Sequence, residues 1–327
     1  MPSAGVIAAL VDDDVEVDPV LHDDEIPIDL GLVRKLVDTE FPQYAGLPLR
    51  RLGASGSTNA LFRLGDDLLV RLPRQPGNGA VIEKEQRWAA EFGPLLPVDV
   101  PQILAIGQPA RGYGEQWSIV GWLAGEHPAA CGPDEPPSRQ RAQLAVDLAD
   151  VIIALRGAPM SDAAAHDPTL RGYRGGALAG IDDWTRTSIE QCRSIAGFDL
   201  DLDLALAVWE DALELPGAYE PGPDGWYHGD LVAENLLVTD GRLSAVIDFG
   251  VGIGDPTIDL HGAWEIFDQP AREVFRERLG AGEAEWLRGR AWALGLALGT
   301  FTYYWHTMPG RRADRLMMAR NILADAH

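Results

Sequence analysis

Alternating apolar and polar positions predict a small β-sheet in the first third of the chain. Gly65-Asp66-Asp67 forms a tight-turn signal inside it, and a helical spacing over residues 80–95 is stopped by Pro97. The predicted strands cover residues 47–53, 60–64, 68–72, 103–107 and 117–123. The pattern therefore predicts a five-stranded antiparallel sheet with one inserted helix, preceded by a helix over 30–40.

Beyond residue 125 the spacing becomes helical. The predicted helices cover residues 138–156, 182–196, 202–215, 258–268, 270–280, 282–304 and 311–326. One hairpin interrupts them, with strands over 235–238 and 243–247 joined by Asp240-Gly241, a strong two-residue turn signal. The Pro- and Gly-rich stretch 216–225 is predicted to be a surface loop. We predict an α+β protein with an acidic N-terminal arm over 1–29, a sheet lobe over 30–124 and a helical lobe over 125–327.

Net charge narrows the classes of partner. The 327 residues include 27 basic and 50 acidic ones, which gives a formal net charge of −23. Such a balance argues against non-specific nucleic-acid binding. It fits a cationic ligand, or a ligand that arrives with a metal ion, and it fits a role in solubility equally well. The ordinary composition excludes a largely disordered chain or a small disulfide scaffold.

Cysteines and apolar runs indicate the compartment. Cys131 and Cys192 lie far apart without the spacing of a zinc site or a disulfide framework. No signal peptide is recognisable, and the apolar run 291–305 is shorter than the ~20 residues that span a bilayer. We therefore predict a cytoplasmic protein without membrane contact. Gly295 and Gly299 in that run predict a close helix contact. No feature predicts the oligomeric state.

Three polar residues have the spacing of a phosphoryl-transfer site. Asn235 follows Asp230 by five residues, and Asp248 comes directly after the predicted hairpin. Mg²⁺ prefers carboxylate and amide oxygens together with phosphates and water. Asn235 and Asp248 flank the hairpin and can converge on one such ion, which leaves Asp230 to face an attacking hydroxyl.

These residues carry a resemblance to a known family. His228-Gly229-Asp230 with Asn235, followed by Ile247-Asp248-Phe249-Gly250, resembles the catalytic and metal motifs of the aminoglycoside phosphotransferase family. The resemblance covers roughly residues 45–325. It implies a bilobal protein-kinase-like fold, Mg²⁺, and ATP or GTP as co-substrate. Gly229, where protein kinases carry Arg, indicates the antibiotic and small-metabolite branch.

The same resemblance assigns supporting roles. Asp259 is expected to buttress the catalytic loop and His228 to anchor it. The loop 53–59 stands where the family covers the nucleotide phosphates, Glu85 matches its helix glutamate, and 120–123 matches its hinge. Trp122 is expected to pack rather than to stack on the base. The predicted nucleotide-binding residues are Ser57, Thr58, Asn59, Arg71, Glu85, Val120 and Leu123.

The third strand departs from the family pattern. The chain has only two lysines, Lys35 and Lys84, and Arg71 stands where the family often has a lysine. Arginine suits the role because its planar fork matches carboxylate and phosphate. Two alternatives stay open: Lys84 reaches the phosphates from the helix, or Arg71 faces solvent.

The acceptor site is expected around the loop 157–180 and the C-terminal helices. Its acidic candidates are Asp182, Asp183, Glu190, Glu265 and Asp268. The favoured interpretation of each one is an ordinary solvated helix residue. The aromatic candidates of the site are Trp184, Trp264, Trp292, Tyr303, Tyr304 and Trp305, and the basic residues of the last helix are Arg311, Arg312, Arg315 and Arg320. We predict transfer of the γ-phosphoryl group to an amine-bearing antibiotic of aminoglycoside type. A macrolide, a choline- or sugar-like metabolite, and an inactive nucleotide-binding regulator are the alternatives.

Overall fold

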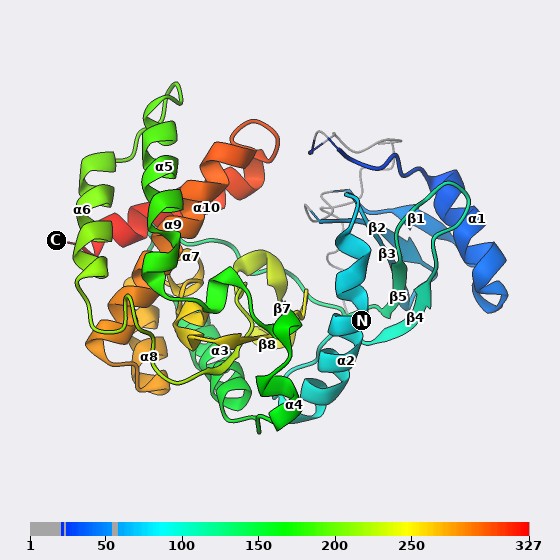
Figure 1. Ribbon diagram of the computed structural model, residues 1–327, viewed down its shortest axis with the longest axis horizontal. Helices are drawn as coiled ribbons and strands as arrows, with labels where there is room; N and C mark the ends of the chain where they lie inside the picture. The colour runs from blue at the N-terminus through cyan, green and yellow to red at the C-terminus, as the bar shows by residue number, and fades with distance from the viewer. Residues whose placement is uncertain (1–20, 23, 54–57, 327) are drawn as a thin grey trace, which may run out of the picture. The chain divides into compact units, whose positions relative to one another are not determined.

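The computed structural model describes residues 21, 22, 24–53 and 58–326, and they form two compact units. The first unit comprises the described residues up to Ala90 together with Val100–Ala124, and the second comprises Glu91–Asp99 together with residues 125–326 (Figure 1). Most of the predicted acidic arm lies outside the described residues. In its described part, the N–H of Ile26 donates to the carbonyl of Arg74 at 2.7 Å, and Asp29 caps the following helix.

The first unit contains the predicted five-stranded antiparallel sheet. Its order is β1-β2-β3-β5-β4, with β1 (Leu49–Arg51), β2 (Asn59–Leu64), β3 (Leu68–Pro73), β4 (Ile103–Gly107) and β5 (Trp117–Gly121). Alternate residues of β2 are buried, as the period of two predicts. Helix α1 (Leu30–Glu40) packs against the sheet core through Val33, Leu36 and Val37, and α2 (Val81–Phe92) is the inserted helix.

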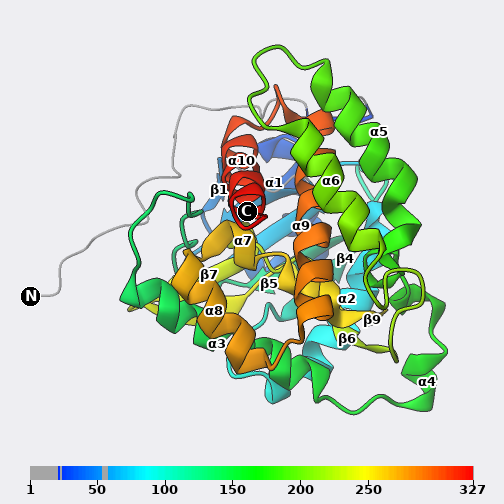
Figure 2. The same cartoon turned by 90° about the vertical axis from the view of Figure 1, so that its left-hand side faces the viewer.

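The second unit is mainly helical. Its helices are α3 (Arg139–Arg156), α4 (Asp162–Ala165), α5 (Asp182–Arg193), α6 (Leu202–Leu213), α7 (Ala263–Ile266), α8 (Gln269–Leu279), α9 (Glu283–Tyr304) and α10 (Pro309–Ala324). Helix α9 packs against α5, α6 and α10, as Figure 2 shows. Short 3-10 turns η4 (Pro168–Leu170), η5 (Tyr173–Gly175) and η6 (Leu178–Ile181) connect α4 to α5.

The contact between α9 and α5 depends on the two glycines singled out in the sequence. A Cβ atom on Gly299 would lie 1.9 Å from Cζ2 of Trp184, and one on Gly295 would lie 3.1 Å from Oγ1 of Thr185. The predicted close helix packing is therefore confirmed. Among the described residues, the helices are too short or too polar to cross a bilayer. The cytoplasmic location stays a prediction.

Two small sheets flank the residues predicted to be catalytic. The predicted hairpin is present as β7 (Leu236–Thr239) and β8 (Arg242–Val246), with Asp240 and Gly241 at φ values of 52° and 76° in its turn. A second pair, β6 (Gly225–Tyr227) and β9 (Gly252–Gly254), was not predicted. It is three residues long and lacks the alternation that marks a half-buried strand, since all of β9 is buried.

The single helix predicted over 258–268 is wrong. The structure has a 3-10 turn, η8 (Pro256–Leu260), followed by the one-turn helix α7. The backbone at Gly262 approaches Leu231 so closely that a Cβ atom there would lie 1.8 Å from its carbonyl oxygen. This tertiary contact with a residue next to Asp230 requires glycine at the boundary between η8 and α7, and the helical spacing of the sequence does not record it.

Candidate active site

A buried carboxylate holds the backbone of the predicted catalytic loop. Asp259, fully buried in η8, accepts hydrogen bonds from the N–H of His228 at 2.9 and 3.1 Å and from that of Gly229 at 2.6 Å. Burial raises the pKa of Asp259, while His228 and the N–H donors act in the opposite direction. The geometry has the form of the predicted buttress; its contribution to catalysis stays a prediction.

His228 occupies a structural position in the same loop. Its Nδ1 accepts the N–H of Asp230 at 3.2 Å, and its ring packs edge-on against Phe249 with centroids 5.6 Å apart. Both contacts point into buried surroundings. They fit an anchor for the loop rather than a group that meets substrate.

Asp230 has a partner on each carboxylate oxygen. Asn235 Nδ2 donates to Asp230 Oδ2 at 3.0 Å and to its backbone carbonyl at 2.9 Å. Arg174 lies 2.6 Å from Oδ1 and also donates to the carbonyl of Gly229 at 2.6 Å. Sequence reasoning missed Arg174, because it lies in the long segment assigned to the acceptor and nothing local marks it.

The charge environment of Asp230 favours the carboxylate anion. Burial opposes ionisation, but Arg174, His261, Arg315 and His228 more than offset it and hold the pKa of Asp230 well below its usual value. Burial lowers the pKa of His261 to about 4, so its ring is neutral at pH 7, and its Nδ1 bonds to a backbone carbonyl. Asp230 is therefore ionised at neutral pH.

Asn235 and Asp248 lie on either side of the open end of the β7–β8 hairpin. The N–H of Ile247 donates to the carbonyl of Asn235 at 2.9 Å, so Asp248 follows the residue paired with Asn235. Asp248 is exposed and has a left-handed φ of 55°, which is uncommon for a residue other than glycine. Because Nδ2 of Asn235 is engaged with Asp230, its Oδ1 is the atom left for a cation.

These two residues fit a magnesium ion better than a tightly chelated metal. They supply one amide oxygen and one carboxylate, which are hard donors. The described part of the chain contains no cluster of three or more His, Cys, Asp or Glu side chains able to hold a metal. Mg²⁺ suits such a sparse set, because it commonly keeps waters and takes phosphate oxygens as further ligands.

In the first unit, Arg71 and Glu85 form a bidentate ion pair. Arg71 Nη1 and Nη2 donate to the two Glu85 carboxylate oxygens at 2.6 and 2.9 Å. The Arg71 side chain is 12% exposed. The alternative of a solvent-facing Arg71 is therefore wrong, whereas its contact with phosphate, and the alternative role of Lys84, stay predictions.

The other predicted nucleotide residues lie along the same sheet. Ser57 is outside the described residues; Thr58 is exposed and its carbonyl accepts the N–H of Arg74 at 2.9 Å, and Asn59 begins β2. Val120 is buried in β5, and Leu123 follows that strand half-buried. The Arg63 guanidinium lies 3.7 Å above the ring of Trp122, as expected for a packing residue.

The sequence of residues 50–292 matches the model of the phosphotransferase enzyme family. This span is well over half of the chain. The chain belongs to this family. No curated protein matches it.

Solved structures of phosphotransferases share the fold. The GDP complex of aminoglycoside 2'-phosphotransferase-IIIa is 18% identical, covers 87% of this chain and 98% of its own, and has a TM-score of 0.65. The gentamicin complex of APH(2")-IIa is 16% identical with coverages of 91% and 97% and a TM-score of 0.60. Macrolide 2'-phosphotransferase MphH from Brachybacterium faecium is 23% identical with coverages of 90% and 98% and a TM-score of 0.56. The predicted family and protein-kinase-like fold are confirmed.

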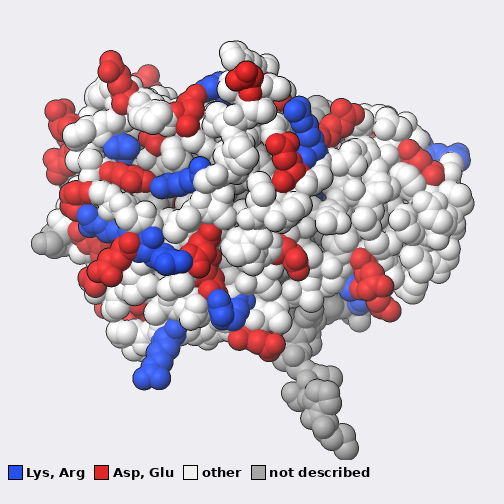
Figure 3. Space-filling model, turned by 90° about the horizontal axis from the view of Figure 1, so that it is seen from below, with Lys and Arg blue, Asp and Glu red and all other residues white. Residues whose placement is uncertain are grey.

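Most acidic acceptor candidates of this phosphotransferase are engaged in internal contacts. Asp182 bonds Arg186 and the indole N–H of Trp209, both at 2.7 Å, and Glu190 bonds Arg193. Acidic and basic side chains intermingle over the face shown in Figure 3. Asp183 is exposed at the start of α5.

Glu265 and Asp268 are both buried, so their interpretation as solvated helix residues is wrong. Glu265 accepts the N–H of Ala233 at 3.1 Å and pairs with Arg315. Asp268 caps α8 and also accepts the N–H of Ser138 at 2.9 Å. Neither is placed to meet an acceptor amine.

The basic last helix lies against acidic residues. Arg311 and Arg315 pair with Glu234 of the catalytic segment at 2.7 and 3.0 Å. Arg320 pairs with Asp199 at 2.8 Å, and Arg312 lies over the ring of Trp305. Helix α10 is therefore tied to the catalytic segment by charge.

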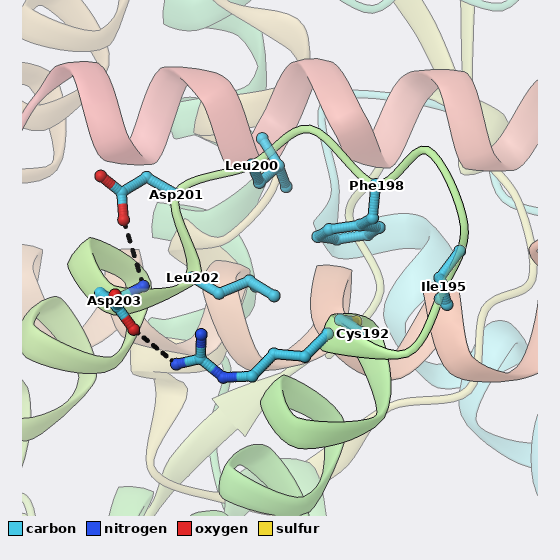
Figure 4. Close-up of a pocket in the computed structure, with 8 residues that line it drawn as sticks. Cys192, Ile195, Phe198, Leu200, Asp201, Leu202 and Asp203 are labelled. Carbon is cyan, nitrogen blue, oxygen red and sulfur yellow. Dashed lines mark hydrogen bonds and ion pairs between the residues drawn. The ribbon is translucent and has the colours of Figure 1, made fainter.

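A shallow pocket of about 420 Å³ lies elsewhere in the second unit, between the end of α5 and the start of α6 (Figure 4). Ile195, Phe198 and Leu202 give it apolar walls, and Arg193 and Asp203 form an ion pair at its rim. None of its lining residues belongs to the catalytic segment, so we do not assign the acceptor to it.

Proposed function

We propose that this protein transfers the γ-phosphoryl group of ATP or GTP to a hydroxyl of an amine-bearing antibiotic, most readily an aminoglycoside. The observation that carries the proposal is the Asp230–Asn235 pair on a loop clamped by Asp259. This arrangement presents one ionised carboxylate beside one amide from the metal-binding motif. It is the layout that phosphoryl transfer to a hydroxyl requires.

Asp230 orients the acceptor hydroxyl and accepts its proton. The low pKa of its carboxyl makes it a weak base, which suits a loose transition state in which the proton leaves late. Positioning and charge neutralisation then supply most of the acceleration. The clamped backbone and the Asn235 contact provide that positioning.

The residues that we expect to face the nucleotide have separate roles. Asn235 Oδ1 and the Asp248 carboxylate would hold Mg²⁺, which neutralises phosphate charge when bound. Arg71, oriented by Glu85, would contact the nucleotide phosphates. The backbone of 120–123 and the loop 53–59 would hold the base and cover the phosphates.

The aminoglycoside proposal rests on charge and on the relatives. A net charge of −23 attracts polycations, and structural relatives are complexes with kanamycin, gentamicin and streptomycin. One observation favours a macrolide as the second candidate: four of the five acidic candidates have internal partners, whereas Trp184 and Tyr303 are 40% and 57% exposed. Exposed aromatic side chains suit a large, partly apolar acceptor.

A panel of acceptors tests the proposal. Release of ADP or GDP is measured with Mg²⁺ for kanamycin, gentamicin, a macrolide, choline and a neutral sugar. We expect the aminoglycosides to give the highest kcat/KM, with a decline as salt screens the attraction. Asp230→Asn should lower kcat by at least about 10²-fold, whereas Asp240→Asn in the hairpin turn should change it less than about twofold.

Each outcome of the panel has a distinct meaning. Preference for the macrolide, without a salt effect, selects the second candidate. Preference for choline or the sugar refutes the antibiotic assignment. Nucleotide binding without turnover of any acceptor refutes the enzyme proposal and favours a regulator.

A further inference from the structure

Arg174 lies directly against the carboxylate assigned to catalysis. One guanidinium nitrogen lies 2.6 Å from Asp230 Oδ1 and 2.6 Å from the carbonyl oxygen of Gly229. The two side chains of the pair are 30% and 32% exposed, so the contact lies at the edge of the solvent. Arg174 thus holds the side chain of one loop residue and the backbone of the residue before it.

The segment that carries Arg174 is docked on a rigid element. A Cβ atom on Gly175 would lie 2.2 Å from the ring of Tyr227, so only glycine fits against β6. The carbonyl of Gly175 accepts the N–H of Asp255 at 2.8 Å, and it lies so close to Gly254 that a Cβ atom there would approach to 2.2 Å. The β6–β9 sheet therefore sets the position of Arg174, and β6 leads directly into the catalytic loop.

Gly229 has a backbone conformation that favours glycine, and it lies in van der Waals range of this arginine. Its φ is +85°, and a Cβ atom on it would lie 3.1 Å from the Tyr227 ring and 3.5 Å from Cδ of Arg174. Protein kinases have an arginine at the position of Gly229. In this chain a guanidinium reaches the loop from a residue 55 positions earlier in the sequence.

The other groups around Asp230 play different parts. Asn235 bonds Oδ2, and His228 accepts the N–H of Asp230. His261 and Arg315 also act on its charge, and Arg315 is itself paired with Glu265 and Glu234. Among the described residues, Arg174 is the cation in ion-pair contact with the carboxylate.

We propose that Arg174 is a positioning residue of the phosphotransferase, which fixes the Asp230 carboxylate in one orientation for the acceptor hydroxyl. The inference rests on the proposed role of Asp230. With Asn235 on one oxygen and Arg174 on the other, rotation of the carboxylate about its terminal torsion is prevented. A torsion of this kind is otherwise broad and two-fold, so its restraint favours a productive geometry.

Steady-state kinetics of Arg174 variants test the inference. Arg174→Gln should lower kcat about 10- to 100-fold, the range expected for a lost hydrogen bond to a charged group, and leave the nucleotide KM within about twofold. Arg174→Lys should recover about three- to tenfold of that loss, because it restores the charge without the fork. Arg171→Gln is the matched control, because Arg171 lies in the same segment as Arg174 and forms an exposed ion pair with Asp224. Its replacement should change kcat less than about twofold.

A double variant separates positioning from structural support. If Arg174 acts through Asp230, then Arg174→Gln should lower kcat by less than about twofold in an Asp230→Asn background. Equal losses in both backgrounds would overturn the inference, as would an unchanged kcat in the single variant. A rise of nucleotide KM with a matching fall of melting temperature would do the same, because it would show general damage to the fold.

The wild-type chain distinguishes this inference from the proposed function. Without turnover of any acceptor by the wild type, the proposed function fails and this inference fails with it. Turnover by the wild type that survives Arg174→Gln refutes the role of Arg174 alone.

Discussion

Replacement of Arg71 is the most informative perturbation of the nucleotide half of the site. Its two hydrogen bonds to Glu85, at 2.6 and 2.9 Å, are charge-assisted and bidentate. Arg71→Ala removes the cation proposed to meet the phosphates and leaves the buried Glu85 carboxylate without this partner. Both effects weaken nucleotide binding and the transition state together.

The structure sets the expected magnitude. A charge-assisted hydrogen bond is worth about 1.5–3 kcal/mol. Loss of the proposed phosphate contact, together with loss of the Arg71–Glu85 pair, should therefore raise the activation free energy that kcat/KM reports by about 2–4 kcal/mol. This corresponds to a decrease of roughly 30- to 1000-fold, with a higher nucleotide KM. Arg71→Lys should recover a good part, because lysine supplies the charge but cannot form both bonds to Glu85.

The assay measures kcat and nucleotide KM at saturating acceptor, with the melting temperature as a control for folding. Lys84→Ala, next to Glu85 on α2, is the comparison variant and should have little effect on either constant. A silent Arg71→Ala combined with a crippling Lys84→Ala would move the phosphate contact to the helix and refute the assignment of this strand.

Three further predictions concern the second unit. Asp259→Asn should lower kcat and destabilise the fold by about 1–3 kcal/mol in chemical denaturation, because an amide nitrogen would face the N–H donors of His228 and Gly229. Unchanged values of both would show that the hydrogen bonds between Asp259 and this loop are dispensable. Gly299→Ala should cost about 1–3 kcal/mol of unfolding free energy through its clash with Trp184, whereas Gly310→Ala, which meets no neighbour, should be neutral or slightly stabilising; equal effects would contradict the close α5–α9 contact. The pKa of His261 is lowered from 6.5 to about 4, so between these pH values the unfolded state binds a proton that the folded state does not. The unfolding free energy should therefore fall by about 1.4 kcal/mol per pH unit as the pH is lowered from 6.5 to 4. His261→Gln should flatten this slope, and an unchanged slope would refute the lowered pKa of His261.

Several features could be predicted from the sequence, because they depend on the conformational preferences of neighbouring residues. The Asp240-Gly241 turn has positive φ at both positions, which these residue types tolerate, so the hairpin between Asn235 and Asp248 was predictable. The sheet of the first unit was predictable because its strands alternate between core and surface. The glycines of α9 revealed a close contact, because the absence of a side chain at two positions one turn apart has few other uses.

The catalytic motif was readable for a related reason. Asp230, Asn235 and Asp248 are joined by a short loop and one hairpin, so their spacing along the chain already constrains their spacing in the fold. The structure adds that Asn235 directs its amide nitrogen to Asp230. Oxygen and nitrogen of an amide cannot be told apart in function until their partners are known.

Contacts between distant segments were decided by the tertiary structure alone. The partners Arg174 and Gly229 lie 55 residues apart, and the burial of Glu265 beside Arg315 joins residues 50 positions apart. In place of the helix predicted over 258–268 stand η8 and α7, and at their boundary Gly262 meets Leu231, a residue 31 positions earlier. A helical or charged pattern records only what each residue does with its near neighbours. The sequence therefore determined which residues we propose to carry the chemistry and on which local elements they lie. The packing of β6, β9 and the Arg174 segment determined how the Asp230 carboxylate is held, because that geometry exists only once remote backbones have come within contact distance.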